Sequence, residues 1–426
     1  MKAIAFKTLG CRVHLFETDA LASRFKAGGY EVVDGGEADI FVVNTCTVTN
    51  TSDQKCRQAI HQIRRKQPEA LIVVTGCMVN HRKDELIQSG IADYVIDNER
   101  KSAIFDIVEE HFKLGHSDPE GYDRDLFSYQ PAFDTFHTRS LIKIHDGCNN
   151  FCSYCIIPMV RGRSTSRPAE DIYNNVRKVV DHGFKEIVLT GVNMGRYNDG
   201  ETCFETLVEN ILNLDGDFRV RVSSIEPDQF SDHFLQLFQH EKLAPHMHIC
   251  LQSGSKDTLK RMHRFYTVAQ FREMCQRIKT FRPDFNLTTD IIVGFPGETE
   301  ETFQESCDFA REIGFSHIHT FKYSKRTGTK AAIMPNQVPE TEKTRRSEVM
   351  RAISLENKLK YFEQMKGKKQ RMLIERIDSK GMARGYGENY IPIQVQGEGL
   401  EKNTFVEVTL REIINPNNED KMAFEV

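Results

Sequence analysis

The 426-residue sequence has no run of the roughly 18 apolar residues that a membrane-spanning helix needs. Its first residues lead into a strand-like run without the long apolar stretch of a signal peptide. We therefore expect a cytoplasmic protein with no membrane partner. The net charge is only −4, so the composition gives no sign of a nucleic-acid partner, and any surface that binds RNA must be local.

Several common catalytic patterns are absent as well. The sequence contains no Ser-His-Asp set and no pair of carboxylates spaced for acid-base chemistry. Residues 294–298 lack the Gly-Lys-Ser/Thr ending of a phosphate loop. The eleven cysteines do not indicate a disulfide framework, because such frameworks belong to short secreted domains. They indicate a reduced metalloprotein.

Three of the cysteines, Cys148, Cys152 and Cys155, follow a C-x3-C-x2-C spacing. Three thiolates hold three irons of a 4Fe-4S cluster, and since the next cysteine is Cys203, the fourth iron stays open to bind a substrate. At this point the chain resembles the radical SAM enzymes, in which that iron binds S-adenosylmethionine (SAM). The alternative is a zinc site with His145 as the fourth ligand, because zinc prefers four N or S ligands.

Three other cysteines, Cys11, Cys46 and Cys77, each follow an apolar run that predicts a strand. Helical patterns separate the runs, which is typical of a parallel, doubly wound sheet. Ligands of such sheets bind where the carboxyl ends of the strands meet, so the three thiols are expected to form a second three-thiol 4Fe-4S site with its own open iron. The alternative is that they are buried core cysteines. The expected strands are 4–6, 40–43 and 71–74, and the expected helices are 15–27 and 53–65.

The sequence around the six cysteines resembles the methylthiotransferases of the radical SAM superfamily, and the resemblance covers essentially the whole chain. Further matches lie at residues 157–158, 161–163, 189–193, 251–255 and 290–298. The resemblance implies an α/β protein of three parts, which its length supports. These parts are an amino-terminal doubly wound parallel-sheet cluster domain (1–115), a linker (116–138), a central partial (β/α)6 TIM-like radical SAM barrel (139–365) and a carboxyl-terminal small antiparallel β-barrel of the TRAM type (366–426).

The resemblance also implies the cofactors and the reaction. The six cysteines would hold two 4Fe-4S clusters, with no catalytic side chain beyond these ligands. A deoxyadenosyl radical would remove a hydrogen that no side-chain base could abstract, and the second cluster would supply sulfur, so two SAM molecules are used per product. The reductant would be an external protein, flavodoxin or similar. The sequence does not identify the sulfur donor.

Six expected strands, at 141–144, 186–189, 220–223, 247–251, 287–293 and 318–321, predict the central barrel. Active groups of such barrels lie at the carboxyl ends of the strands. The resemblance implies that the residues there bind SAM, although each could instead be an ordinary helix cap or turn. The expected SAM-binding residues are Phe151, Tyr154, Thr190, Gly191, Asn193, Ser223, Glu226, Gln252, Gly294 and Phe295.

The carboxyl-terminal part begins with a charged helix over 341–364 and a basic run over 366–371. Short strands are expected at 371–377, 382–386, 390–395 and 405–411. The resemblance implies a tRNA anticodon stem-loop as the partner. The basic run is explained equally by contact with RNA phosphates and by a solvated, soluble surface. Tyr386 and Tyr390 could stack on bases or pack in the core.

The family's branches differ in substrate. One modifies isopentenyladenosine in tRNA, another threonylcarbamoyladenosine at the same position 37, and a third an aspartate of a ribosomal protein. The surroundings of Cys11 and Cys46 most resemble the threonylcarbamoyladenosine branch, although His14 stands where that branch generally has Asn. The expected reaction is therefore methylthio transfer to carbon 2 of N6-threonylcarbamoyladenosine, with the other two substrates as alternatives.

A carboxylate distinguishes threonylcarbamoyladenosine from isopentenyladenosine, and Arg is its natural bidentate partner. We expect Arg12, Arg161 or Arg163 to bind it. Two other classes remain open: a radical SAM methylase, which would need no second cluster, and a non-catalytic RNA-binding protein. The sequence decides neither the tRNA species nor the oligomeric state. The remaining cysteines are expected to pack in cores: Cys56, Cys203, Cys250, Cys275 and Cys307.

Overall fold

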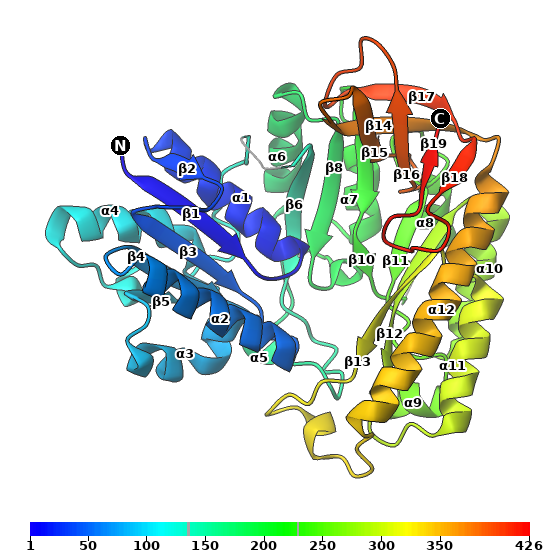
Figure 1. The fold of residues 1–426 in the computed structure, drawn as a ribbon, viewed down its shortest axis with the longest axis horizontal. Coiled ribbons are helices and arrows are strands. Elements are labelled where there is room, and N and C mark those ends of the chain that lie inside the picture. The colour runs from blue at the N-terminus through cyan, green and yellow to red at the C-terminus, as the bar shows by residue number, and fades with distance from the viewer. Residues whose placement is uncertain (134–136, 228–229) are drawn as a thin grey trace.

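The computed structural model describes residues 1–133, 137–227 and 230–426. Three β-structured regions follow one another along the chain, and the middle one contacts both of the others (Figure 1). The expected linker 116–138 includes residues 134–136, which lie outside the described residues. No helix among those described is long and apolar enough to cross a membrane.

The amino-terminal region is a parallel sheet. Its elements are β1 (Ala3–Thr8), α1 (Arg12–Ala27), β2 (Glu31–Val33), β3 (Ile40–Thr45), α2 (Asn50–Lys66), β4 (Leu71–Gly76), α3 (Cys77–Ser89), β5 (Tyr94–Ile96), η1 (Lys101–Ala103) and α4 (Ile104–Leu114). The strand order is β2-β1-β3-β4-β5. Apolar side chains of α1 and α4 pack on one face, and those of α2 and α3 on the other. The three expected strands and both helices are confirmed, whereas β2 and β5 were not expected.

The middle region contains two four-stranded sheets that follow directly along the chain. Its strands are β6 (Arg139–Asp146), β7 (Thr165–Ser166), β8 (Glu186–Gly191), β9 (Arg219–Val222), β10 (Ser224–Ile225), β11 (His246–Ile249), β12 (Asn286–Val293) and β13 (His317–Lys322). The orders are β7-β6-β8-β9 and β10-β11-β12-β13, and only Ser223 separates β9 from β10. All pairs except β6 with β7 are parallel. The six expected strands are confirmed.

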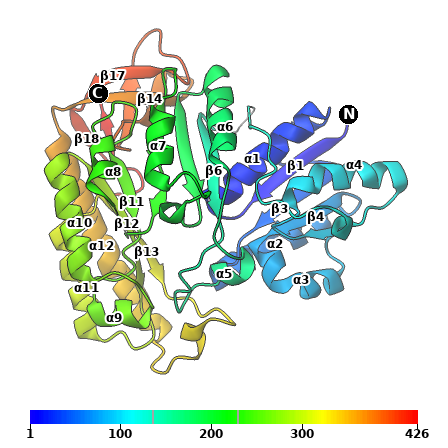
Figure 2. The same ribbon diagram turned by 180° about the vertical axis from the view of Figure 1, so that it is seen from behind.

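Helices cover one face of these strands (Figure 2). The described helical segments between residues 119 and 365 are η2 (Pro119–Gly121), α5 (Ile157–Val160), α6 (Ala169–Asp181), η3 (Met194–Arg196), α7 (Phe204–Leu212), α8 (Asp232–Leu237), α9 (Lys256–Arg261), α10 (Val268–Phe281), α11 (Glu300–Ile313), η4 (Lys330–Ile333) and α12 (Glu340–Met365). Strand residues such as Ile142, Leu189 and Ile249 form an apolar core with α6, α7, α10 and α11. Alternate residues point to the opposite face, which is therefore polar. That face carries Lys143, His145, Glu186, Thr190, Arg221, Ser223, His246, His248, Asp290 and His319.

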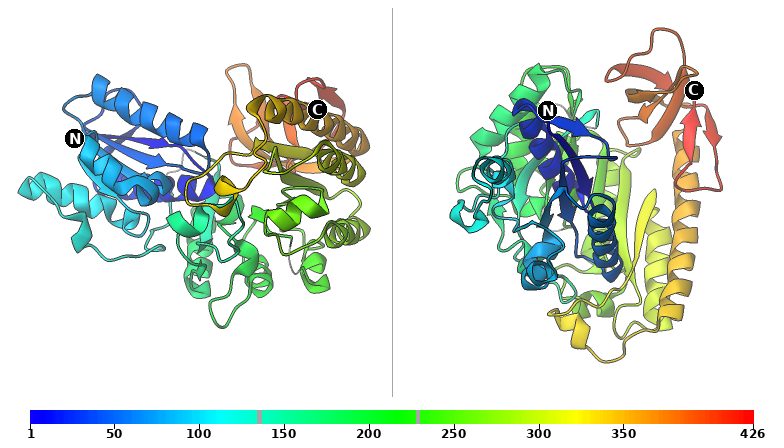
Figure 3. Two further views of the ribbon diagram at one scale, coloured as in Figure 1. Left: turned by 90° about the horizontal axis from the view of Figure 1, so that it is seen from below. Right: turned by 60° about the vertical axis from the view of Figure 1, so that its left-hand side comes forward.

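The carboxyl-terminal region is a six-stranded sheet beside the end of α12 (Figure 3). Its strands are β14 (Lys369–Ile377), β15 (Met382–Tyr386), β16 (Pro392–Gln396), β17 (Phe405–Thr409), β18 (Glu412–Ile414) and β19 (Ala423–Glu425), in the order β17-β14-β15-β16-β19-β18. The four expected strands are confirmed, whereas β18 and β19 were not expected. Arg219 of β9 donates to the Arg371 carbonyl at 2.8 Å, which fastens this region to the middle one.

Candidate functional site

The first cysteine triad lies at the carboxyl ends of β1, β3 and β4. Cys11 caps α1, Cys46 follows β3 and Cys77 begins α3. At Gly76, φ is 101° and a Cβ would lie 2.3 Å from the Thr45 carbonyl oxygen, so glycine is required for this close approach. Burial, together with the neighbouring thiols of Cys77 and Cys11, raises the pKa of Cys46 to about 12. The three thiols therefore lie near one another.

His14 lies between two thiols of this triad. Its Nδ1 is 3.4 Å from Cys11 Sγ, and its Nε2 is 3.6 Å from Cys77 Sγ. Only 1% of His14 is exposed. The residue that departs from the family pattern therefore contacts the triad itself.

A buried network of ion pairs joins the first triad to the middle region. Glu17 of α1 pairs with Lys101, Lys143 and Arg161, and Asp146 of β6 pairs with Lys143 and Arg161. None of the five is more than 2% exposed. Three cations and two carboxylates leave one surplus positive charge.

This surplus charge lies beside the triad, because Arg161 Nε donates to Cys77 Sγ at 3.3 Å. An uncompensated buried charge is costly unless an anion lies near it. Thiolates that bind a metal are such anions. The first triad and its network therefore fit an anionic iron-sulfur cluster.

The second triad lies in the loop after β6. At Gly147, φ is 69° and a Cβ would lie 1.9 Å from the Arg163 carbonyl oxygen, so this tight loop also requires glycine. Burial, together with the thiols of Cys152 and Cys148, raises the pKa of Cys155 to about 12. These three thiols therefore also lie near one another, which fits a second cluster.

Two side chains donate to sulfurs of the second triad. Asn193 Nδ2 is 3.6 Å from Cys148 Sγ, and Arg264 Nη1 is 3.2 Å from Cys152 Sγ. Within the part of the chain that the structure describes, Asn193 Oδ1 is buried without a hydrogen-bond partner, so it can accept from an amine at this site. Sequence reasoning missed Arg264, which also pairs with Glu226, because it lies 112 residues from the cysteine that it contacts.

His145, the proposed fourth ligand of a zinc site, has other partners. The backbone N–H of Asn193 lies 3.3 Å from Nδ1, and Nε2 is 2.8 Å from the Ser164 hydroxyl. Burial lowers the pKa of His145 to about 4, so the ring is neutral. Both ring nitrogens are in use, which argues against the zinc alternative.

The residues expected to bind SAM occupy two kinds of position. Thr190 and Gly191 end β8, and Asn193 and Glu226 contact partners of the second triad, as described above. Tyr154 and Gln252 line a cavity described below. Asn193 lies against Cys148, and Tyr154 and Gln252 share a cavity with Cys155. That these six residues bind SAM stays a prediction.

The other four expected residues lie differently. Phe151 is 43% exposed and lies under the Arg163 guanidinium, and the Ser223 hydroxyl lies 3.9 Å from Met194 Sδ. At Gly294, the Lys343 side chain fills the space that a Cβ would need. Phe295 is completely buried and packs with Tyr154 and Tyr323. Gly294 and Phe295 therefore support the site by packing against the side chains around it.

One cavity of about 210 Å³ is lined by both regions. Val48 and Thr49, just after Cys46, form one side, and Tyr154 and Cys155 form another. Cys155 of the second triad and the residues just after Cys46 of the first thus border one shared space. The remaining lining residues are Ile156, Ile157, Gln252, Asp290, Ile292, Phe321, Lys322, Tyr323 and Ser324.

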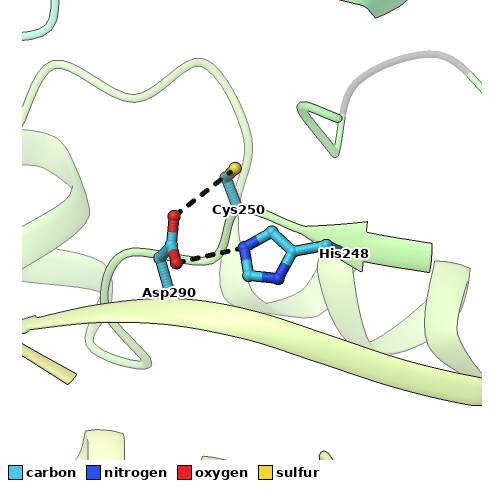
Figure 4. Close-up of side chains that lie close together, drawn as sticks. All are labelled: His248, Cys250 and Asp290. Carbon is cyan, nitrogen blue, oxygen red and sulfur yellow. Dashed lines mark hydrogen bonds and ion pairs between the residues drawn. The ribbon is translucent and has the colours of Figure 1, made fainter. Parts of the chain in front are cut away.

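Asp290 lines this cavity, and Figure 4 shows it with His248 and Cys250 beside it. His248 Nε2 is 3.0 Å from one Asp290 oxygen, and Cys250 Sγ is 3.9 Å from the other. Burial would raise the pKa of Asp290, but His248 lowers it, so the carboxylate is ionised and tied to the histidine. These atoms lie close enough to hold a cation, yet His248 and Asp290 already satisfy each other.

The three expected substrate arginines have different environments. Arg161 donates its N–H groups to Glu17, to Asp146 and to the first triad, so none remains for a substrate carboxylate. Arg163 is exposed against Phe151. Arg12 forms no ion pair among the residues that the structure describes, and its Nη1 is buried without a partner. Arg12 is therefore the strongest candidate.

The groups near Arg12 belong to the polar face and to the carboxyl-terminal region. Burial, with Arg221 and Arg12, lowers the pKa of His246. Burial alone would raise the pKa of Tyr390, but Arg139 and Arg12 lower it. Tyr390 and Tyr386 stack on each other with Arg139 beside them, which supports packing for both.

Four of the remaining cysteines, Cys56, Cys250, Cys275 and Cys307, are buried, as expected. Cys203 is exposed at the N-cap of α7, so the expectation that it packs in a core is wrong. A helix pattern does not reveal which side of its first turn faces solvent.

Comparison with known proteins agrees with this geometry. Residues 3–97 match the "Uncharacterized protein family UPF0004", and residues 142–310 match the "Radical SAM superfamily". The threonylcarbamoyladenosine tRNA methylthiotransferase MtaB of Bacillus subtilis is 37% identical over 99% of this chain and 97% of its own length. The chain belongs to the radical SAM methylthiotransferase family. The MtaB of Thermotoga maritima is 35% identical over 93% of this chain and 92% of its own.

Other members of the family carry a different name. The tRNA-2-methylthio-N(6)-dimethylallyladenosine synthase of Pelotomaculum thermopropionicum is 34% identical over 91% of this chain and 90% of its own. Among solved structures, the radical S-adenosylmethionine methyltransferase TsrM of Kitasatospora setae superposes with a TM-score of 0.56 at 15% identity, covering 78% of this chain and 77% of that one. This likeness shows the α/β radical SAM fold alone.

Proposed function

We propose that this methylthiotransferase modifies carbon 2 of N6-threonylcarbamoyladenosine at position 37 of tRNA, next to the anticodon. The observation that carries the proposal is that Cys155 of the second triad lines one cavity together with Val48 and Thr49, which follow Cys46 of the first triad. A radical SAM methylase would need no first triad. Relatives named for this nucleoside are 33% to 37% identical to the chain.

Two 4Fe-4S clusters and SAM would supply the sulfur and a carbon-centred radical. Cys11, Cys46 and Cys77 would hold one cluster, and Cys148, Cys152 and Cys155 the other. Asn193 Oδ1 would accept from the SAM amino group, because it is the buried oxygen without a partner beside Cys148. Tyr154 and Gln252 would line the nucleoside pocket and exclude water.

We further propose a three-domain organisation for the chain. It has a doubly wound cluster domain (1–115), a linker (116–138), a partial (β/α)6 barrel (139–365) and a TRAM-type barrel (366–426). A groove of about 690 Å³ on the last region is lined by Arg376, Arg384 and Lys421 and also by Glu375 and Asp420, so cations outnumber carboxylates there, which suits an anticodon stem-loop. An external flavodoxin-like protein would supply electrons, and the enzyme would work in the cytoplasm.

Incubation with two anticodon-loop RNAs tests the substrate. Anaerobically reconstituted protein is mixed with SAM, sulfide, reductant and an RNA that carries either threonylcarbamoyladenosine or isopentenyladenosine. We expect a methylthio nucleoside by mass spectrometry from the first RNA only. Product from the second RNA only would keep the enzyme class and overturn the substrate.

Arg12 is proposed to bind the substrate carboxylate. A hydrogen bond to a charged group contributes about 1.5–3 kcal/mol, so Arg12→Gln should lower kcat/KM for the threonylcarbamoyladenosine RNA by roughly 10- to 150-fold. Arg163→Gln is the matched comparison, because Arg163 is the other arginine with donors to spare. An unchanged preference between the two RNAs in Arg12→Gln would discard this assignment.

A further inference from the structure

We infer that Arg161 and His14 are positioning residues that raise the reduction potential of the cluster at Cys11, Cys46 and Cys77. They do so by donating N–H···S hydrogen bonds to its ligands from two different regions of the chain. The inference rests on the proposed function, because it requires a cluster at the first triad.

Arg161 is held rigidly against the triad. Its Nη1 donates to Glu17 at 3.0 Å and to Asp146 at 2.8 Å, and its Nη2 donates to Glu17 at 3.3 Å. These bonds fix the plane of the guanidinium, whose five N–H groups form a rigid fork. The Nε–H that remains points at Cys77 Sγ, 3.3 Å away, and cannot turn from it without breaking ion pairs.

His14 donates to the same triad in either tautomer. A neutral imidazole carries a hydrogen on one ring nitrogen only. If the hydrogen is on Nδ1, it faces Cys11 Sγ at 3.4 Å; if it is on Nε2, it faces Cys77 Sγ at 3.6 Å. The backbone N–H of Cys11 and the Nη2 of Arg161 lie near the two nitrogens, each at 3.3 Å, and can supply the donor that the other nitrogen accepts.

Both contacts favour the reduced form of a bound cluster. Reduction adds a negative charge, and hydrogen bonds to the sulfurs and nearby positive charge stabilise it, which raises the potential. The surplus positive charge of the Glu17, Asp146, Lys101, Lys143 and Arg161 network acts in the same direction. Because these groups are buried, salt screens them little.

This hydrogen bond of Arg161 links the two cysteine triads. Arg161 follows α5, which directly follows the loop of the second triad, yet its donor reaches Cys77 in the amino-terminal region. The potential at the first triad therefore depends on how the loop of the second triad is seated.

The test is a redox titration of the full-length chain with Cys148, Cys152 and Cys155 changed to Ala, so that the first triad alone can hold a cluster. The midpoint potential is followed by electron paramagnetic resonance after anaerobic reconstitution. We expect Arg161→Gln and His14→Leu to shift it to more negative values. His14→Gln, which keeps an N–H donor, should shift it less, and Arg163→Gln should leave it unchanged.

The outcomes separate this inference from the proposed function. A triple-Ala protein without iron would overturn both. Iron at full occupancy with an unchanged potential in Arg161→Gln and His14→Leu would overturn only the inference. If Arg161→Gln fails to fold because Glu17 and Asp146 each lose one of their partners, the comparison of His14→Leu with His14→Gln decides.

Discussion

Near the second triad, single side chains donate N–H hydrogen bonds to the cysteine sulfurs. The Arg264 side chain is 3% exposed and serves Cys152, Glu226 and the Cys250 carbonyl at once. Charged donors of this kind form the stronger hydrogen bonds of proteins. Arg264 therefore ties a cysteine ligand to a residue expected to bind SAM.

Arg264→Met should slow SAM cleavage while leaving the cluster in place. The loss of a charged hydrogen bond of about 1.5–3 kcal/mol corresponds to roughly 10- to 150-fold in the rate of 5′-deoxyadenosine formation. The measurement uses protein with Cys11, Cys46 and Cys77 changed to Ala, with iron content as the control. A normal rate at full iron occupancy would contradict the prediction.

The cysteines could be predicted from sequence, but most of their partners could not. Each thiol follows an apolar run or stands in a short spacing motif, and both are local signals. His14 and Arg161 meet across 147 residues, so only the packing of α1 against β6 reveals the contact. His14 carried a signal in its departure from the family pattern, and Arg161 and Asn193 lie in stretches that match that pattern, whereas Arg264 carried none.

At the scale of elements, the segment between β13 and η4 fastens the middle region to α2. Arg326 donates to Asp53 and to the Thr47 hydroxyl, each at 2.7 Å, and to Asn50 at 2.7 Å. The Asn50 backbone N–H donates to the Ser324 hydroxyl at 3.0 Å. This segment thus closes the side of the cavity formed by Val48 and Thr49.

Arg326→Leu should loosen the amino end of α2. Breaking a buried ion pair costs about 3–5 kcal/mol, and here it leaves Asp53 with only the Thr47 hydroxyl and the more distant Arg82 Nε, at 3.8 Å. Amide hydrogen exchange of Asn50–Lys66 is expected to accelerate, with α4 as the internal reference. Arg326→Leu combined with Asp53→Asn should recover part of the protection; no recovery would argue against the ion pair as the cause.

Short strands, three of them at sheet edges, explain what the element predictions missed. β2 and β5 have three residues each, and β18 and β19 are equally short. A period-2 pattern needs about four residues to be recognised. The longer strands, such as β3 and β4, were expected because each begins with four apolar residues and is buried along its whole length.

At the scale of the whole molecule, Glu186 holds the middle and carboxyl-terminal regions together. It pairs with Arg219 and Arg221, which donate to backbone carbonyls of the last region. Burial would raise the pKa of Glu186, but the two arginines hold it far below its ordinary value. The stabilisation by the carboxylate is therefore complete above about pH 4.5 and is lost as the pH falls toward the lower folded pKa.

Acid should therefore release the carboxyl-terminal region. We expect pepsin cleavage within β14 to β16 to increase as the pH falls from 4.5 to 2. Glu186→Gln removes the titrating group, so its cleavage should already be raised at pH 4.5 and should depend less on pH. Identical pH profiles for the two proteins would assign the transition to other carboxylates.

One residue of the first region lies near one residue of the last region. Arg12 is close enough to Tyr390 to lower its pKa, although 378 residues separate them. Ribosomes add about 5–20 residues per second, so Arg12 waits roughly 20–80 s for this neighbour during synthesis. The amino-terminal sheet can fold early in that interval. The surroundings of Arg12, however, are completed only when nearly the whole chain has been made, so unfinished chains carry cysteine triads without a finished substrate pocket.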